Sequence, residues 1–330
     1  MPRKVVLLLL AGLLFVLAGL GLAGYRRYIA PGPLAEAATV VIPRGSGTEA
    51  IARHLAAAGV VADRWVLPLA AKLTGARPMA GEYLFPAHVS PQEALAQMVA
   101  GRTVVHKLTV AEGLTVRRVL DLVREADYLA GAVTVKPAEG SLLPETWHLS
   151  RDDLRDDVVA RMERAMRQTL AAAWATRAPG LPLATPQQAL ILASIVERET
   201  AIPAERPHVA AVFENRLRKG MRLQSDPTVI YGLSNGLGVL DRPLDRQDLA
   251  AAHPWNTYVI DGLPPTPIAN PGRASIEAVL HPEASDDLYF VADGSGGHVF
   301  ARTLDQHNAN VAHWRRVEKA RAQHAGSAAP

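Results

Sequence analysis

The 330-residue sequence contains no cysteine, which removes several kinds of chemistry at once. A disulfide framework, a thiol nucleophile, a cysteine-ligated metal and a lipid-modified N-terminal cysteine are all excluded. Lysine is also scarce. After Lys107 only Lys136, Lys219 and Lys319 follow, so pyridoxal chemistry through a Schiff-base lysine has little support. We therefore expect a protein that works without a cofactor.

Two familiar hydrolase motifs are missing as well. The histidines are scattered without an HExxH pair that would bind zinc, and no GxSxG turn presents a serine nucleophile. The formal net charge is only +3, and no basic stripe indicates nucleic-acid binding. Because 49% of the residues are hydrophobic, the chain can still build a substantial core and two domains.

What the sequence does have is a long apolar run near its start. The run Val5–Gly24 contains twenty residues and no charge, and it lies between two basic flanks. At 1.5 Å per residue such a helix just spans a bilayer core of roughly 30 Å, whereas the apolar region of a signal peptide is usually about 7–15 residues. We therefore predict an uncleaved single-pass anchor in residues 1–28. The positive-inside rule slightly favours a cytoplasmic N-terminus, because Arg3, Lys4 and the amino group face only Arg26 and Arg27.

A short Pro/Ala linker at residues 29–38 leads into a small α+β module at residues 39–103. The clearest local signal in the module is Ser90-Pro-Gln-Glu93, a capping box that starts a helix, with Gly101 as its stop. The pattern predicts, in order, a strand, two helices, a strand and a helix, at residues 39–43, 48–58, 63–73, 81–85 and 90–100.

Residues 104–320 are expected to form a larger mixed α+β domain, followed by a disordered tail at 321–330. The Pro-rich stretch His253–Gly272 is too irregular for a helix or strand, and long structured loops of this kind are commonly functional. The other predictions are a strand at 108–113, an ordered loop at 138–149, a hairpin at 288–301, and helices at 116–123, 152–174, 185–200, 207–219, 275–280 and 305–320.

The helix at residues 185–200 is the centre of this predicted domain. Thr185 can cap its start, and the run Ala189–Val196 has a single polar residue, Ser194, which is typical of a buried helix. Glu197 comes at the end of this apolar run. A carboxyl among apolar neighbours is expected to have a raised pKa, as a general acid requires. The alternative is an exposed glutamate at the helix end.

A carboxyl acid facing a cleft suits the cleavage of a glycosidic bond, in which an acid protonates the leaving oxygen. Polar and aromatic loop side chains suit sugar recognition, through hydrogen bonds and stacking on ring faces; examples here are Gln224, Asn256 and Tyr258. Hydrolases usually add a second carboxylate, and the candidates are Glu145, Glu199, Glu214 and Asp226.

Four longer stretches closely resemble the endolytic murein transglycosylase family, also called YceG-like. They are ASIVERE (193–199), VFENRLRKGMRLQSDPTVIYGL (212–233), NTYVIDGLPPTPIANPG (256–272) and LYFVADGSGGHVF (288–300). The loop EGSLLPETW is similar to that family's EGxLFPDTY, with Leu143, Glu145 and Trp147 substituted. The resemblance extends from the anchor to about residue 314.

The resemblance implies an inner-membrane protein with its bulk outside the cytoplasm, a LysM-like module at residues 39–103, and cleavage within nascent peptidoglycan strands. Glu197 occupies the position of the family's catalytic glutamate. In that role it would protonate the oxygen between N-acetylmuramic acid and N-acetylglucosamine. It would then act as base while the muramic 6-hydroxyl attacks the anomeric carbon to form a 1,6-anhydro end. No second protein carboxylate is then required, and strand elongation would end at the cut.

Besides the glycan strands and the membrane, peptidoglycan synthases are expected partners of such a protein. Asp226, which precedes Pro227, fits a turn or a helix cap as well as a binding site. Two other functions stay open: a non-catalytic peptidoglycan-binding or scaffold protein of the cell-wall synthesis machinery, and a hydrolase in which water is the nucleophile. By motif position, we expect the cleft to be lined by Gln224, Ser225, Asp226, Asn256, Thr257 and Tyr258.

Overall fold

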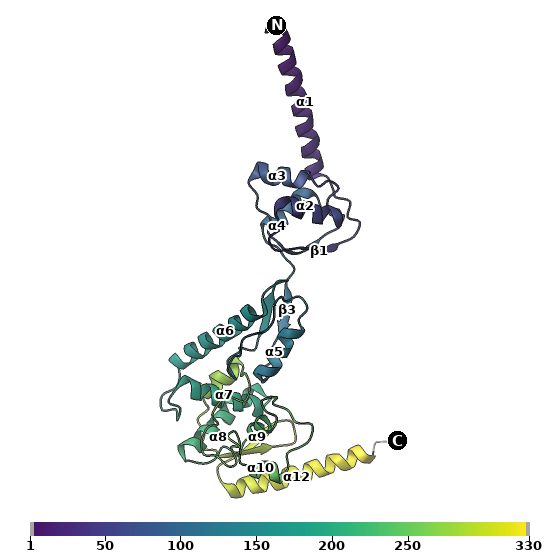
Figure 1. Ribbon diagram of the computed structural model, residues 1–330. Coiled ribbons are helices and arrows are strands. Elements are labelled where there is room, and N and C mark those ends of the chain that lie inside the picture. Colours follow the sequence, from purple (N-terminus) through teal and green to yellow (C-terminus); the bar gives the residue numbers. More distant parts are fainter. Residues whose placement is uncertain (1–2, 328–330) are drawn as a thin grey trace. The chain divides into compact units, whose positions relative to one another are not determined.

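Figure 1 shows the computed structural model of the chain, which describes residues 3–327. The prediction of a mixed α+β protein with one N-terminal apolar helix is confirmed. The chain divides into two compact units. Unit 1 contains Met1–Lys107, Tyr128–Ala130 and His148–Asp153, and unit 2 contains Leu108–Asp127, Gly131–Trp147 and Leu154–Pro330.

Unit 1 begins with helix α1 (Arg3–Ile29), which carries the apolar run. None of its residues is buried, and its leucines and valines are exposed along its length. By length and composition this helix can cross a membrane. Soluble domains seldom expose an apolar surface as large as that of α1 to water, because an exposed apolar area of several hundred Å² favours association.

The rest of unit 1 is a small module with the element order that the sequence predicts. Its strands pair antiparallel with Val40 opposite Tyr83, and their alternate residues point into the core, where Ile42 and Phe85 are fully buried. The predicted capping box is present, since Ser90 and Glu93 each accept a hydrogen bond from the other's backbone N–H. The elements are β1 (Ala38–Ile42), α2 (Thr48–Ala57), α3 (Val66–Thr74), β2 (Gly81–Phe85) and α4 (Pro91–Val99).

Strands β3 (His106–Thr109) and β4 (Thr146–Leu149) form a second two-stranded sheet, and β5 (Tyr289–Ala292) pairs with β6 (His298–Ala301) in the predicted hairpin. Unit 2 is otherwise helical. Its helices are α5 (Val116–Glu125), α6 (Arg155–Ala175), α7 (Pro186–Glu199), the 3-10 turn Pro203–Glu205, α8 (Arg206–Arg218), α9 (Asp226–Leu233), α10 (Arg246–Ala250), α11 (Arg273–Leu280) and α12 (Leu304–Ser327).

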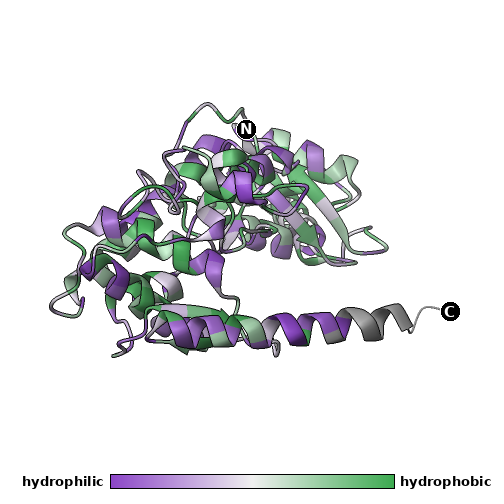
Figure 2. Cartoon of the chain, turned by 90° about the horizontal axis from the view of Figure 1, so that it is seen from below, coloured by the Kyte–Doolittle hydropathy of each residue, from purple (hydrophilic) through white to green (hydrophobic). Residues whose placement is uncertain are grey.

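Four of these elements differ from the prediction. Strand β4 replaces the end of an expected loop, and the short helices α9 and α10 were not expected, because each lies among prolines or charges that weaken a periodic signal. Helix α12 runs to Ser327 and so includes most of the segment 321–330 that we expected to be disordered. Figure 2 shows hydrophilic and hydrophobic residues alternating along α12, whose inner face packs on β5 and β6.

The core of unit 2 is built around α7. All eight residues of Ala189–Val196 are buried, as predicted, because α6, α8, α9 and α11 pack against this helix from several sides. The cap at Thr185 is confirmed, since its Oγ1 accepts the Gln188 N–H at 3.2 Å. The single polar residue of the run, Ser194, is also satisfied. Its hydroxyl donates to Ile191 O at 2.7 Å and accepts the Ile268 N–H at 3.0 Å.

The irregular stretch between His253 and Gly272 contains no helix or strand, as predicted, and it is held by buried polar contacts. Asn270 is fully buried and joins three segments of unit 2. Its Oδ1 accepts the Leu142 N–H at 2.9 Å, and its Nδ2 donates to Leu114 O at 2.8 Å. These contacts satisfy backbone groups that have no partner in a sheet or helix.

We expect Asn270→Ala to destabilise the protein by about 1–3 kcal/mol, because it leaves the Leu142 N–H buried without its partner. It also removes one of the two hydrogen bonds to the Leu114 carbonyl, which keeps the bond from the Asn270 backbone N–H. The free energy of unfolding measured with urea tests this. The control is Asn308→Ala on the exposed surface of α12, which should change it by less than about 0.5 kcal/mol. Equal effects of the two substitutions would contradict the role given to Asn270.

Candidate functional site

Glu197 lies in the last turn of α7, and its side chain is only 5% exposed. Its surroundings are more polar than the sequence suggested. Oε1 accepts a hydrogen bond from Arg206 Nη2 at 3.1 Å, and Oε2 accepts the Gly272 N–H at 2.9 Å. Each oxygen of this carboxyl therefore has one charged or backbone donor, which fixes its position and leaves further lone pairs free.

Arg206 is the first residue of α8, and it connects two carboxyl groups. Besides Glu197 it contacts Glu112, whose Oε2 lies 3.2 Å from the same Nη2. The Glu112 side chain is 43% exposed, so the arginine joins a buried carboxyl to one that meets solvent. The Nε–H of Arg206 is buried and has no hydrogen-bond partner within residues 3–327. Neither Glu112 nor Arg206 was predicted from the sequence, because neither stands out in its local pattern.

Position 272 favours a residue without a side chain. It is the N-cap of α11, with φ −74°, so its backbone is open to any residue. A Cβ at this position, however, would overlap the Glu112 carboxyl, which lies directly against the Gly272 Cα. The absence of a side chain lets Glu112 and the Gly272 N–H approach Glu197 together. The amino end of α11 also carries a partial positive charge that favours a carboxylate beside it.

Glu199 follows two residues later and points to a different side of α7, because two helical steps turn by about 200°. Its Oε1 accepts a hydrogen bond from the Ser225 hydroxyl. Burial raises the pKa of Glu199 to about 7, with the nearby Asp226 carboxylate acting in the same direction. The Ser225 hydrogen bond and the charges of His298 and Arg216 oppose this shift. A carboxyl with this pKa is partly protonated at neutral pH.

Three of the predicted cleft residues gather beside Glu199. The Tyr258 hydroxyl donates to Asp226 Oδ1 at 2.6 Å, and burial together with this bond raises the pKa of Tyr258. Asp226 is exposed and is the first residue of α9; the N-cap of this helix is Ser225, so Asp226 is not the helix cap that the sequence allowed. Gln224 is also exposed, and its positive φ of 53° marks a sharp bend before the helix. Asp226, Gln224 and Tyr258 can thus meet a ligand.

The other three predicted residues lie inside the protein. Asn256 and Thr257 are fully buried and Ser225 nearly so. The Asn256 amide donates to backbone carbonyls around Ala251 and accepts the Tyr258 N–H, while Thr257 Oγ1 accepts the Ser225 N–H at 2.9 Å. These three residues position the exposed ones and have no free surface for a sugar.

One ion pair and two hydrogen bonds of an arginine stabilise this side of the site. His298 on β6 bonds Glu205 at 2.7 Å, and Glu205 accepts the Thr200 hydroxyl at 2.9 Å, which ties the end of α7 to the hairpin. Arg216 donates to Leu223 O at 2.8 Å and Leu288 O at 2.6 Å. Arg216 therefore connects the loop before Gln224 to the start of the β5–β6 hairpin. His298, which lies in the predicted hairpin, thus has a structural partner.

The remaining candidates for a second carboxylate lie elsewhere. Glu214 is fully buried and pairs with Arg218 at 2.9 Å, and its burial raises its pKa to about 7. Glu145 is half exposed and lies 3.6 Å from Arg273. Within residues 3–327 no group of three metal-ligating side chains is close enough to hold an ion. The titratable groups gathered around Glu197 and Glu199 include several carboxyls, and carboxyl groups can act as acid and base on glycosidic bonds.

The chain belongs to the YceG-like family, whose model matches residues 40–313. An endolytic murein transglycosylase of Bacillus subtilis is 48% identical over 119 residues, which cover 36% of this chain and 32% of that protein. An endolytic murein transglycosylase of Streptococcus pneumoniae serotype 2 is 28% identical over 320 residues, covering 83% of this chain and 58% of that protein. The match thus spans about a third of the length of the Bacillus subtilis relative and somewhat over half of the length of the Streptococcus pneumoniae relative.

A crystal structure of a yceG-like protein from Listeria monocytogenes has a similar fold. It is 29% identical, with a TM-score of 0.50, and the match covers 83% of this chain and 99% of that one. Glu112, Glu197, Arg206 and Gly272, which are joined by hydrogen bonds, all lie inside the part of the chain that matches the family.

We expect Gly272→Ala to lower the free energy of unfolding by about 1–3 kcal/mol, because the new methyl group must displace Glu112. Gly47→Ala is a matched control. Gly47 is the N-cap of α2 with φ −70°, nearly the same backbone geometry, and nothing lies within 4 Å of a Cβ there. Urea unfolding of both variants tests the difference. A Gly272→Ala protein as stable as Gly47→Ala would show that the close approach is unimportant.

The raised pKa of Glu199 also predicts a pH dependence of stability. Its folded value of about 7 exceeds the ordinary 4.5, so between these pH values the unfolded chain loses its proton first and stability falls as pH rises. Glu199→Gln, which stays neutral, should reduce this fall by up to roughly 3 kcal/mol. Glu214 acts in the same direction, so part of the slope will remain. Unfolding at pH 4.5 and 7.5 tests this, with exposed Glu125→Gln as a control that should leave the slope unchanged.

Proposed function

We propose that this protein is a membrane-anchored endolytic transglycosylase, which cleaves the bond between N-acetylmuramic acid and N-acetylglucosamine within nascent peptidoglycan strands. The observation that carries the proposal is the buried Glu197 carboxyl, held between Arg206 and the Gly272 N–H in a chain of the YceG-like family. Relatives named endolytic murein transglycosylase support the choice of substrate.

In this mechanism Glu197 acts first as an acid. It gives its proton to the glycosidic oxygen while the bond from that oxygen to the muramic C1 breaks, and the N-acetylglucosamine hydroxyl leaves. Glu197, now a carboxylate, takes the proton of the muramic 6-hydroxyl as this oxygen bonds to C1. The product is a 1,6-anhydro end, Glu197 regains its proton, and no water or second protein carboxylate takes part.

The neighbours of Glu197 suit its second role. Arg206 and the Gly272 N–H hold the carboxyl in one orientation, as a base that takes the proton of a positioned hydroxyl requires. Glu199 is the alternative acid, because its pKa of about 7 keeps it partly protonated at neutral pH. The two carboxyls point to different sides of α7, so one substrate position cannot use both in the same way.

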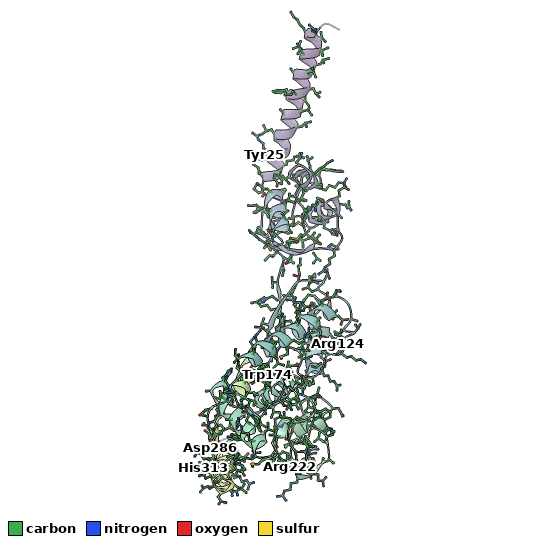
Figure 3. The ribbon with its side chains drawn as sticks, turned by 90° about the vertical axis from the view of Figure 1, so that its left-hand side faces the viewer. Tyr25, Arg124, Trp174, Arg222, Asp286 and His313 are labelled. Carbon is green, nitrogen blue, oxygen red and sulfur yellow. The ribbon has the colours of Figure 1, made fainter. Side chains whose placement is uncertain are left out.

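Sugar binding is assigned to the members of the predicted set that reach the surface, the exposed Gln224 and Asp226 and the partly buried Tyr258. Gln224 and Asp226 offer hydrogen-bond groups, and Tyr258 offers a ring edge and a hydroxyl beside them. Ser225, Asn256 and Thr257 support these three from inside. Arg222 lies nearby and donates to Tyr258 O at 2.9 Å, so it fixes the same loop from the solvent side (Figure 3).

The cellular setting follows from the first hundred residues. Helix α1 is proposed to span the inner membrane once. Arg3 and Lys4 would then lie on the cytoplasmic side, and the chain after α1 would lie outside the cytoplasm. Residues 39–103 are proposed to be a LysM-like module that contacts glycan. Cleavage close to the membrane would end strand elongation and bring the protein near peptidoglycan synthases. The competing function is a non-catalytic scaffold that binds strands without cutting them.

We expect Glu197→Gln to lower the rate of glycan cleavage at least about 100-fold, because an amide cannot donate and then accept a proton. The measurement is mass spectrometry of the products that full-length protein in detergent releases from uncrosslinked glycan strands. Wild-type protein should yield internal fragments with anhydro ends. Glu199→Gln should retain activity within about ten-fold, and Glu125→Gln, which is remote and exposed, should match the wild type.

Each of the other outcomes would assign a different function or a different catalytic residue. Full activity of Glu197→Gln with loss in Glu199→Gln would move the acid role to Glu199. Reducing ends in place of anhydro ends would make the enzyme a hydrolase with water as nucleophile. Strand binding without cleavage by the wild type would favour the scaffold.

A further inference from the structure

Helix α3 in unit 1 has an apolar stripe that points away from the core. Its inner face carries Leu67 and Ala71, which are buried in the module. Its outer face carries Leu69 and Leu73, which are 55% and 77% exposed, together with Trp65, which is 65% exposed at the helix start. These three residues are spaced four apart, so they form one stripe along the helix. The three most exposed large apolar side chains of the module therefore lie together on the outer face of α3.

This stripe lies beside the anchor. Figure 1 shows α3 next to the C-terminal end of α1, and the two helices are in contact. They share an apolar groove, to which α1 contributes residues from Leu20 to Tyr28 and α3 contributes Leu69 and Leu73. Tyr25 lies at the place where α1 reaches the module (Figure 3). The stripe is therefore continuous with the apolar surface of α1.

Continuity with α1 fixes the depth of the stripe. The uncharged run of α1 ends at Gly24, so Leu20 lies roughly 6 Å inside that end at 1.5 Å per residue. Interfacial helices bury their apolar face by about 5–10 Å at the boundary of headgroups and acyl chains. Side chains that share a groove with Leu20 and Tyr25 are consequently at that boundary when α1 spans the bilayer.

We propose that the outer face of α3, formed by Trp65, Leu69 and Leu73, is embedded in the interfacial layer of the bilayer that α1 crosses. This inference rests on the proposed anchor. Trp65 is of the residue type that collects at membrane interfaces, and Tyr25 provides a second aromatic ring at the end of α1.

The charges around the stripe identify the kind of surface. Lys72 is exposed on α3, the Arg64 guanidinium lies 4.9 Å from the Trp65 ring centre, and Arg26 and Arg27 end the anchor. Such basic residues beside an apolar face match anionic headgroups. Arg27 also pairs with Asp63 at 3.2 Å, which links the end of α1 to the residues before α3. The module is thus attached to an anionic lipid surface by a second contact besides the anchor.

The lack of cysteine allows a direct test with single labels. Full-length protein carrying Leu73→Cys is labelled with an environment-sensitive fluorophore and placed in nanodiscs of phosphatidylcholine and phosphatidylglycerol. Leu84→Cys on β2 is the matched control, since Leu84 is an exposed leucine of the same unit at 53%. Leu14→Cys on α1 reports insertion of the anchor. Quenching is compared between nitroxides on the lipid chains and iodide in water.

We expect the Leu73→Cys label to be quenched by a nitroxide near the headgroups at least about three-fold more than the Leu84→Cys label, and to be protected from iodide. Equal iodide access at the two positions, with the Leu14→Cys label quenched at the bilayer centre, would overturn the proposal and leave the anchor intact. Lack of quenching at Leu14→Cys would overturn both. Protection at Leu73→Cys that appears only when a nanodisc holds two copies would assign the stripe to a second chain instead.

Discussion

The buried carboxyl of Glu197 is the constraint on which unit 2 depends. A carboxylate taken out of water is unfavourable unless donors replace its hydration, and here the replacements come from Arg206 at the start of α8 and the Gly272 N–H at the start of α11. Three helix ends must therefore meet within hydrogen-bonding distance. The apolar run of α7 makes this possible, because it packs against both α8 and α11 and holds their ends beside its own.

Much of this arrangement could be read from local signals. The cap at Thr185, the buried run after it and the capping box at Ser90 depend on residues a few positions apart, so the sequence alone predicts them correctly. Glu112 could not be found in this way, because it lies 94 residues from Arg206. Helix α9 was missed for another reason: its first turn, Asp226-Pro227, resembles a simple turn as much as a helix start.

The predicted cleft residues show why motif position alone does not separate binding from support. Irregular loops carry backbone groups without partners, and buried amides and hydroxyls often satisfy them. Asn256 and Thr257 do this, whereas Gln224, Asp226 and Tyr258, from the same two stretches, remain accessible. Each of the two predicted stretches therefore contains both buried and accessible polar side chains. Burial, which depends on packing with distant segments, decides which side chains within them can touch a ligand.

The unpaired Nε–H of Arg206 has a consequence for how the site works. A buried donor without a partner costs about 1–3 kcal/mol, and native proteins tolerate few of them. Here the same guanidinium binds a buried and an exposed carboxyl through Nη2, while its buried Nε–H has no hydrogen-bond partner within residues 3–327. A sugar hydroxyl that accepted this hydrogen bond would gain more than one bound at the surface, because it would remove an existing penalty. In that case Arg206 would connect a bound sugar to the position of Glu197 through its Nη2 contact.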